Sequence, residues 1–193
     1  MTKSELRKIY LEKQKSLSAV EREEKSSQIA TRFFASFDLA RVKLLHVFLP
    51  IERNGEIDTF ILIKRLRRDF PQIVTVTSRV DFETMTLESR RFDSETKLVE
   101  NRWRISEPAD GELFENKRID VCLVPLLCFD ERGFRVGYGK GFYDKFLSEC
   151  RKDCLKIGLS YFPAAAEVSD AQEFDVKLDF CVTPQAVHSR QKQ

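Results

Sequence analysis

The chain has 193 residues, of which 42% are hydrophobic and 33% charged, a composition typical of ordinary globular proteins and not of membrane or disordered ones. Lys and Arg number 33 against 31 Asp and Glu, so the formal net charge of +2 gives no electrostatic argument for a nucleic-acid partner. This length suits one sizeable hydrophobic core, so we expect a single domain over residues 1–193 with a frayed tail over 188–193.

The N-terminal segment and the cysteines indicate the cellular compartment. MTKSELRKIYLEKQ is charged from residue 3 and lacks the apolar stretch of a signal peptide, and no run reaches transmembrane length. The five cysteines form no C-x-x-C pair. Cys150 and Cys154 have helical spacing that a metal could use, but the two histidines that could join them are distant in sequence. We expect a cytoplasmic protein with reduced, structural cysteines and no membrane contact.

Helices and strands alternate along the chain. Two capping-box patterns, at residues 2–5 and 18–21, predict two helices in about the first 36 residues. Hydrophobic periodicity then predicts a strand, an amphipathic helix, a strand and a half-exposed strand in the ranges 42–50, 58–70, 72–78 and 84–92.

The second half of the chain contains the most hydrophobic stretch, 119–129, which predicts a central strand buried on both faces. A glycine-rich loop follows, and then a helix and two strands in the ranges 141–150, 155–162 and 179–184. This alternation predicts an α/β protein: a three-layer, Rossmann-like fold with a largely parallel central sheet flanked by helices.

The glycine-rich stretch GFRVGYGKGFYDKFL contains four of the seven glycines. It follows the predicted central strand and leads into a helix, and therefore lies at the sheet edge where open α/β proteins bind ligands. Gly137, Gly139 and Gly141 allow positive φ and close approach of the backbone, so their N–H groups could hold phosphate oxygens while Lys140 adds charge. The alternative is a tight turn with a solvated lysine; the gathering of glycines favours phosphate.

Two general phosphate motifs do not fit this loop. A Walker A loop has four residues between its glycines and then Lys-Ser/Thr, whereas five residues separate Gly133 from Gly139 and Lys140 precedes a glycine. The dinucleotide fingerprint G-x-G-x-x-G is also absent.

The longer stretch IDVCLVPLLCFDERGFRVGYGKGFYDKFL resembles the signature of the 5-formyltetrahydrofolate cyclo-ligase family. There, a strand ending in Val-Pro leads through Phe-Asp and Gly to a Gly-Tyr-Gly-x-Gly-Tyr-Tyr-Asp loop. Weaker matches follow in the family's order: KSELR, FLP with GEIDT, RWRISEP, KIGLSY and EFDVKLDFCVT. Family members use ATP to phosphorylate the formyl oxygen of 5-formyltetrahydrofolate, so that nitrogen 10 attacks the activated carbon and 5,10-methenyltetrahydrofolate forms. The resemblance implies an ATP- and Mg²⁺-dependent ligase.

The resemblance implies that Lys3 and Arg7 contact ATP phosphates, because they match the family's Lys-x-x-x-Arg. Residues four apart share a helix face. From the residues alone, two solvated charges on an amphipathic helix remain the alternative.

The resemblance also assigns the glycine-rich loop to the nucleotide, with the charges of Arg135 and Lys140 as the catalytic candidates. Relatives often have glycine in place of Lys140, so we expect this lysine to assist and not to be indispensable. The loop residues that match are Arg135, Gly137, Tyr138, Gly139, Lys140, Gly141, Phe142 and Tyr143.

Two carboxylates match the family's magnesium ligands: Asp144, in the first turn of the helix after the loop, and Asp175 in EFDVK. Carboxylates are the hard oxygen donors that Mg²⁺ prefers. The alternative for Asp144 is an acid stabilised by the helix dipole.

The folate side of the site is implied by residues further upstream. Glu56 in GEIDT matches the family's folate-contacting glutamate on the nitrogen 10 side, and Leu49 lines the same pocket; the alternative for Glu56 is a loop acid that starts a helix. Trp103 could stack on the pterin or aminobenzoyl ring, although a lone Trp also suits core packing. Candidate substrate contacts are Arg7, Leu49, Glu56, Trp103, Tyr138 and Phe142.

Some details depart from the family or stay open. Phe142 replaces the usual tyrosine and lacks its hydroxyl, and the PIERNG loop is longer than in some relatives. The basic run KRLRR at 64–68 could attract a folate polyglutamate tail or form a solvated helix face.

Two other classes of protein are weighed against the ligase. A non-catalytic nucleotide or folate sensor would not need the two aspartates, and a sugar-phosphate isomerase would leave Lys3, Arg7 and the loop unexplained. We expect a monomer acting on 5-formyltetrahydrofolate, with its polyglutamate preference open.

Overall fold

The structure, a computed structural model, describes residues 1–190. Its α-helices are α1 Lys3–Ser16, α2 Ala19–Ser36, α3 Phe60–Asp69 and α4 Phe142–Glu149. Its strands are β1 Leu44–His46, β2 Val74–Asp81, β3 Thr86–Arg91, β4 Leu98–Glu100, β5 Ser106–Pro108, β6 Leu113–Phe114, β7 Val121–Pro125, β8 Cys128–Phe129, β9 Arg135–Val136, β10 Leu155–Leu159, β11 Phe180–Val182 and β12 Val187–Ser189. Short 3₁₀ helices lie at Glu52–Asn54 and Asn116–Arg118.

One eight-stranded sheet forms the centre of the described chain, with the strand order β12-β11-β10-β7-β1-β2-β3-β6. The inner strands β11, β10, β7, β1 and β2 are parallel to one another, and the outer strands β12, β3 and β6 add antiparallel pairs. The prediction of a largely parallel α/β sheet is confirmed.

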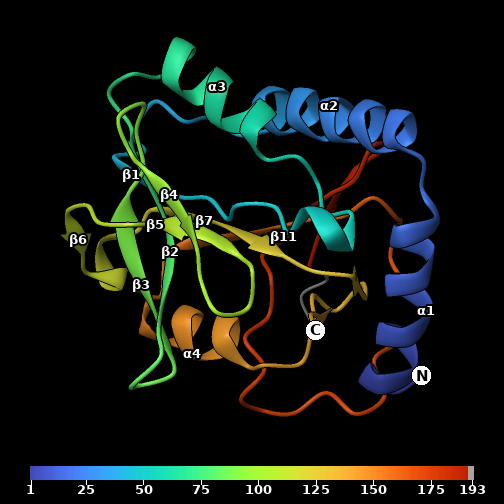
Figure 1. The fold of residues 1–193 in the computed structure, drawn as a ribbon. Helices are drawn as coiled ribbons and strands as arrows, with labels where there is room; N and C mark the ends of the chain where they lie inside the picture. Colours follow the sequence, from blue (N-terminus) through green and yellow to red (C-terminus); the bar gives the residue numbers. More distant parts are fainter. Residues whose placement is uncertain (191–193) are drawn as a thin grey trace.

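Helices cover both faces of this sheet (Figure 1). Strand β7 shows why its sequence is so apolar: Val121 and Leu123 pack into the cluster beneath α2 and α3, whereas Cys122 and Val124 face α4. Alternate side chains of a strand point to opposite faces, so a strand between two helical layers is apolar throughout. The predicted three-layer arrangement is confirmed.

Both predicted N-terminal helices begin where their capping boxes place them. The Thr2 hydroxyl accepts from the Glu5 backbone N–H while the Glu5 carboxylate accepts from that of Thr2, and Ser18 and Glu21 repeat the arrangement. These reciprocal bonds satisfy N–H groups that the helix itself cannot pair.

Several sequence predictions need correction. The apolar run 119–129 is not one strand, because β7 ends at Pro125, which has no N–H to continue the ladder, and β8 then pairs with β9 in a separate ribbon. The hairpin of β4 and β5 was not predicted. The tail does not fray from residue 188, since His188 and Ser189 pair with β11; residues 191–193 lie outside the described part.

The five cysteines are free and buried, in agreement with the prediction of reduced structural thiols. Within residues 1–190, no helix combines the length and apolar character needed to cross a membrane.

Candidate active site

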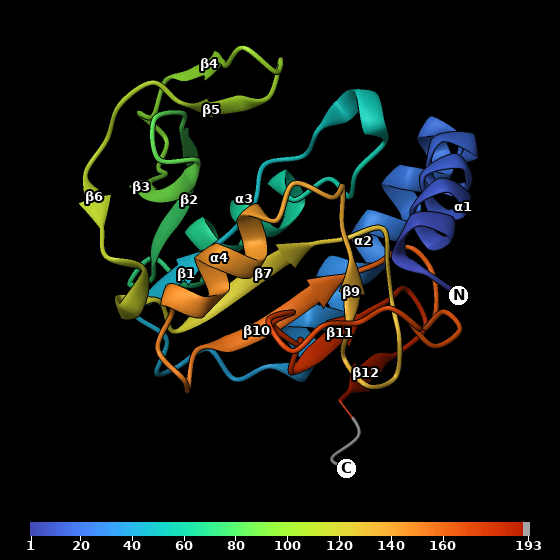
Figure 2. The same ribbon diagram turned by 90° about the horizontal axis from the view of Figure 1, so that it is seen from below.

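A cleft of about 780 Å³ opens at the carboxyl ends of β7, β1 and β2. Figure 2 shows the hairpin β4–β5 and helix α1 on opposite sides of this edge. Helices α3 and α4, which follow β1 and β7, pack on opposite faces of the sheet, so the chain leaves these two paired strands in opposite directions. This arrangement creates ligand crevices in α/β proteins. The volume is that of a site for small molecules.

Every site residue predicted from the sequence lines this cleft. They come from five separate segments of the chain: Lys3 and Arg7; Leu49 and Glu56; Trp103; Arg135, Gly137, Tyr138, Gly139, Lys140, Gly141, Phe142, Tyr143 and Asp144; and Asp175.

The glycine-rich loop uses two of its glycines as expected. Gly139 and Gly141 have φ of +88° and +73°, and Gly141 is the N-cap of α4, whereas Gly137 does not adopt the positive φ that a glycine allows. A Cβ at Gly139 would lie 3.1 Å from the guanidinium carbon of Arg7. Gly139 therefore allows the loop to approach α1.

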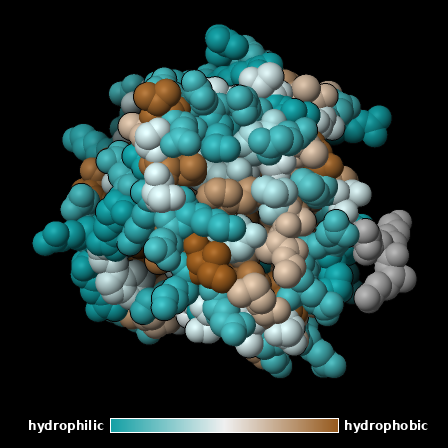
Figure 3. All heavy atoms as spheres, turned by 90° about the vertical axis from the view of Figure 1, so that its right-hand side faces the viewer, coloured by the Kyte–Doolittle hydropathy of each residue, from teal (hydrophilic) through white to brown (hydrophobic). Residues whose placement is uncertain are grey.

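Helix α1 turns Lys3 and Arg7 toward the cleft, which excludes the solvated-face alternative. Nε of Arg7 donates to the Gly137 carbonyl at 2.9 Å, and Nζ of Lys3 lies 2.5 Å from a carboxylate oxygen of Asp175. The face of the molecule that contains α1 is mostly hydrophilic, with scattered hydrophobic residues (Figure 3).

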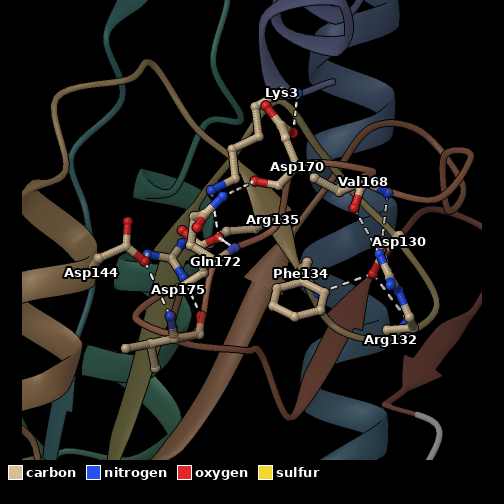
Figure 4. A network of polar contacts seen from close by, with 11 residues as sticks. Lys3, Asp130, Arg132, Phe134, Arg135, Asp144, Val168, Asp170, Gln172 and Asp175 are labelled. Carbon is tan, nitrogen blue, oxygen red and sulfur yellow. Dashed lines mark hydrogen bonds and ion pairs between the residues drawn. The ribbon is translucent and has the colours of Figure 1, made fainter. Parts of the chain in front are cut away.

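Two ion pairs, Arg135–Asp144 and Lys3–Asp175, line the cleft (Figure 4). Asp144 accepts from Arg135 at 2.8 Å and from the backbone N–H of Val176 at 3.2 Å. The same arginine also donates to the Val176 carbonyl, and Asp175 pairs with Lys3. Asp144 thus does more than face the α4 dipole, because it joins the glycine-rich loop to the chain beside Asp175.

The donor set suits a magnesium ion shared with a phosphate ligand. Within residues 1–190, no group of three or more His, Cys, Asp or Glu side chains could hold a metal alone. Mg²⁺ is commonly held by one or two carboxylates with phosphate oxygens and waters, and Asp144 and Asp175 line one cleft.

Glu56 lines the cleft together with apolar residues. Leu49 is buried there, and the Glu56 carboxylate accepts from the backbone N–H of Ile51 at 2.8 Å. Desolvation raises the pKa of Glu56 to about 7, although hydrogen bonds from Tyr138 and Ile51 act in the opposite direction. Glu56 therefore changes its protonation state close to neutral pH.

Trp103 lies at the tip of the β4–β5 hairpin and is half-buried, which excludes simple core packing. Its ring packs edge-on against Phe142 and Phe82, with centroids 5.7 and 4.9 Å away. Nζ of Lys140 lies 5.9 Å from the Trp103 ring centroid, so this exposed lysine stands beside the aromatic wall.

Sequence reasoning missed some lining residues. Thr77 and Ser78 belong to the carboxyl-terminal half of β2. Because β2 runs parallel to its neighbour β1, both strands end at the same edge of the sheet, so the strand pattern could have indicated these two residues. Gln14 does not line the cleft, but its buried amide bonds the Asn54 carbonyl and the Tyr138 hydroxyl beside it; it was missed because a polar residue on a charged helix carries no signal of burial. The basic run 64–68 is not part of the cleft; its Arg65 and Arg68 pair with Asp69.

The fold and site define an α/β protein with a glycine-rich loop and a cleft at the carboxyl edge of its sheet. Residues 1–184 match the family model described as the 5-formyltetrahydrofolate cyclo-ligase family, and the chain belongs to this family.

Individual relatives agree with this assignment. The chain is 29% identical to the 5-formyltetrahydrofolate cyclo-ligase of Escherichia coli K12, over 91% of this chain and 97% of the relative. The solved 5,10-methenyltetrahydrofolate synthetase of Aquifex aeolicus has a TM-score of 0.79 at 28% identity, covering 100% of this chain and 95% of that one. The corresponding Mycoplasma pneumoniae structure has a TM-score of 0.75 at 27% identity, covering 95% and 99%.

Proposed function

We propose that the chain catalyses the ATP-dependent cyclisation of 5-formyltetrahydrofolate to 5,10-methenyltetrahydrofolate, with release of ADP and phosphate. The observation that carries the proposal is the lining of one cleft. Cationic residues, a glycine-rich loop and two carboxylates share it with apolar and aromatic side chains and one glutamate of raised pKa. Membership of the cyclo-ligase family supports the same reading.

The cationic residues and the glycine-rich loop suit the triphosphate of ATP as co-substrate. Lys3 and Arg7 reach it from α1, and the loop from Arg135 to Tyr143 supplies backbone N–H groups next to the N-terminus of α4. Lys140 stands at the aromatic wall and Arg135 at the carboxylates, so their charges lie along the path between the two substrates. Such a site acts mainly by positioning and by offsetting charge.

The chemistry explains the need for both substrates in one cleft. An amide oxygen is a poor leaving group, so the formyl oxygen first takes the terminal phosphoryl group of ATP and ADP departs. Nitrogen 10 then attacks the formyl carbon, the carbon–oxygen bond breaks and phosphate leaves. The proton of nitrogen 10 must be lost, and Glu56 as a carboxylate is suited to accept it because its pKa of about 7 is near neutral pH.

Asp144 and Asp175 are the residues that would hold Mg²⁺. When bound, the ion supplies positive charge to the phosphate oxygens during transfer. In the structure these carboxylates pair with Arg135 and Lys3. On binding, Mg²⁺ would replace the two cations as partner of the carboxylates, and the phosphate oxygens would replace the carboxylates as partners of the two cations.

The rival classes make different predictions for one experiment. We expect the near-ultraviolet band of the methenyl product only when 5-formyltetrahydrofolate, ATP and Mg²⁺ are all present, with ADP accumulating in step. Equal product without ATP would contradict the ligase and favour an isomerase-like role. Binding of both ligands without any product would instead indicate a sensor.

Two further expectations remain predictions, a monomer and a cytoplasmic location, and the preference for polyglutamylated folate stays open. Sedimentation, fractionation and a comparison of mono- and polyglutamylated substrates test them separately.

A further inference from the structure

The turn between β4 and β5 is built around the side chain of Asn101. Its carbonyl oxygen Oδ1 accepts from the backbone N–H groups of Trp103 at 2.9 Å and Ile105 at 3.2 Å. Two backbone bonds close the same turn: the Asn101 N–H donates to the Ile105 carbonyl at 3.0 Å, and the Arg104 N–H donates to the Asn101 carbonyl at 2.8 Å. Asparagine side chains commonly take the place of a backbone carbonyl in turns. Asn101 therefore sets where the turn places Trp103.

The backbone conformation of this turn needs such support. Arg104 has a φ of +54°, in the left-handed region that residues with a long side chain seldom adopt. A residue stays in that region when the surrounding interactions fix the backbone around it. Asn101 supplies them, because its side chain bonds Trp103 and Ile105, the two neighbours of Arg104.

Glu107 connects the turn to the main sheet. Its side chain is buried and lines the cleft, and its Oε2 accepts from the Asn101 side-chain amide at 2.8 Å and from the Val80 backbone N–H at 3.2 Å. Val80 belongs to β2 of the eight-stranded sheet, whereas β4 and β5 form a sheet of their own. A buried carboxylate is costly unless donors satisfy it, so this connection holds the hairpin turn to the edge of the cleft.

Trp103 is the side chain that the turn brings to the cleft. Trp103 lines the cleft and Asn101 does not, so Asn101 can act on a bound molecule only through the residues that it holds. The Trp103 ring is half-buried and packs edge-on against Phe82 and Phe142. A displaced turn would separate this ring from both neighbours and change the aromatic wall of the cleft.

We propose that Asn101 and Glu107 are positioning residues for folate binding, which hold Trp103 in the wall of the cleft through one chain of hydrogen bonds. This inference rests on the proposed function and deepens it. The chain runs from the Val80 N–H through the Glu107 carboxylate and the Asn101 amide to the Trp103 N–H.

The first test needs no ligand. Trp103 is the only tryptophan, so fluorescence excited where tyrosine does not absorb reports on this turn alone. In Asn101→Ala we expect emission at longer wavelength and stronger quenching by acrylamide than in wild type, because the ring becomes more exposed to water. The matched control is Asn116→Ala. Asn116 also donates to a glutamate, Glu149, at 2.7 Å but lies outside the cleft, so its loss should leave the emission unchanged.

A reversed pair tests the contact between the two residues. Asn101→Asp keeps an acceptor for the backbone N–H groups of the turn but places a second carboxylate beside Glu107, so we expect the emission to shift as in Asn101→Ala. In Asn101→Asp/Glu107→Gln the introduced amide can donate to the introduced carboxylate, which restores the bond in the opposite direction. The emission of this double variant should return to the wild-type position.

Binding measurements connect the turn to the substrate. By calorimetry, Asn101→Ala should raise the Kd of 5-formyltetrahydrofolate on the order of tenfold, comparable to the loss of one good hydrogen bond. The Kd of MgATP should not change, which a general loss of folded protein would not produce. In a Trp103→Ala background Asn101→Ala should cost no further folate affinity, because it acts through that ring. The reversed pair should bind folate as wild type does.

The outcomes separate this inference from the proposed function. Unchanged emission in Asn101→Ala, an equal shift in Asn116→Ala, or no recovery in the reversed pair overturns it even if the wild type is an active ligase. Recovered emission without recovered folate affinity also overturns it, since Glu107 would then contact the folate directly. A wild type that binds no 5-formyltetrahydrofolate would refute the proposed function, and the folate role of Asn101 and Glu107 with it.

Discussion

At the residue scale, Glu56 shows a conflict between folding and function. Its folded-state pKa of about 7 lies above the usual value of 4.5, mainly because its carboxyl is desolvated. The folded chain therefore holds a proton that the unfolded chain releases between these two values. Stability contributed by neutral Glu56 is complete at low pH, declines as pH rises through this interval and stays low above it.

Replacing Glu56 by Gln should remove this decline. The quantity to compare is the unfolding free energy of the variant minus that of wild type. Each pKa unit corresponds to about 1.4 kcal/mol, so this difference should be larger at pH 8 than at pH 4 by at most about 3 kcal/mol. Urea melts at the two pH values measure it. His46, whose burial lowers its pKa to about 4, contributes the opposite slope but is present in both proteins and cancels. Parallel stability profiles for the two proteins would contradict the prediction and show that Glu56 is solvated. Catalytic turnover should be lost in the variant.

Asp144→Asn tests the placement of the metal. The change keeps size and a carbonyl acceptor for the Val176 N–H but removes the charge that would hold Mg²⁺. We expect turnover to fall roughly a hundredfold or more while 5-formyltetrahydrofolate binding changes little.

Because Asp144 also pairs with Arg135, the variant needs a control for the lost ion pair. Asp120→Asn serves, since Asp120 bonds Arg151 at the same 2.8 Å and lies outside the cleft. Its activity should stay near wild type. Wild-type turnover with unchanged Mg²⁺ dependence in Asp144→Asn would return that residue to a purely structural role.

At the element scale, one side of α1 packs into a hydrophobic cluster and another lines the cleft. Leu6 is buried against Val136 and Val168, while Lys3 and Arg7 point into the cleft. The sequence predicted the start of the helix from its capping box, and the family resemblance supplied the role of its cations. Gln14 could not be found in this way, since its partners are distant in sequence and only the packed fold brings them together.

Arg7→Ala should weaken ATP binding by about 1.5 to 3 kcal/mol, the range for hydrogen bonds to charged groups, as measured by calorimetry. Loss of the bond to Gly137 should reduce unfolding free energy by only about 1 kcal/mol. Lys8→Ala, an exposed change on the same helix, is the control and should alter neither quantity. Normal ATP affinity in Arg7→Ala would leave that arginine with a structural role only.

At the scale of the whole molecule, the sequence predicted the parallel sheet well because its strands carry strong local signals. Strand β7 is apolar on both faces, and the helices α3 and α4 have clear amphipathic patterns. The hairpin β4–β5 was missed because Leu98 and Val99 are exposed and its strands are three residues long, so no buried face imposes an alternating pattern. The residues of the cleft were predicted from a motif. The ion pair between Lys3 and Asp175 was not, because it depends on long-range packing that periodicity does not encode.

That pairing joins residues 172 positions apart, which affects how the protein matures during synthesis. Helix α1 is translated well before Val168, Asp170 and Asp175, the residues against which it packs and pairs. A 14-residue helix is marginal on its own in water, so until residues 168–175 are made this segment lacks part of the packing around Leu6 and the partners of Lys3. Complete docking of α1 is thus a late event of folding, and a nascent chain that stops short of residue 168 lacks the partners that hold Lys3 at the cleft.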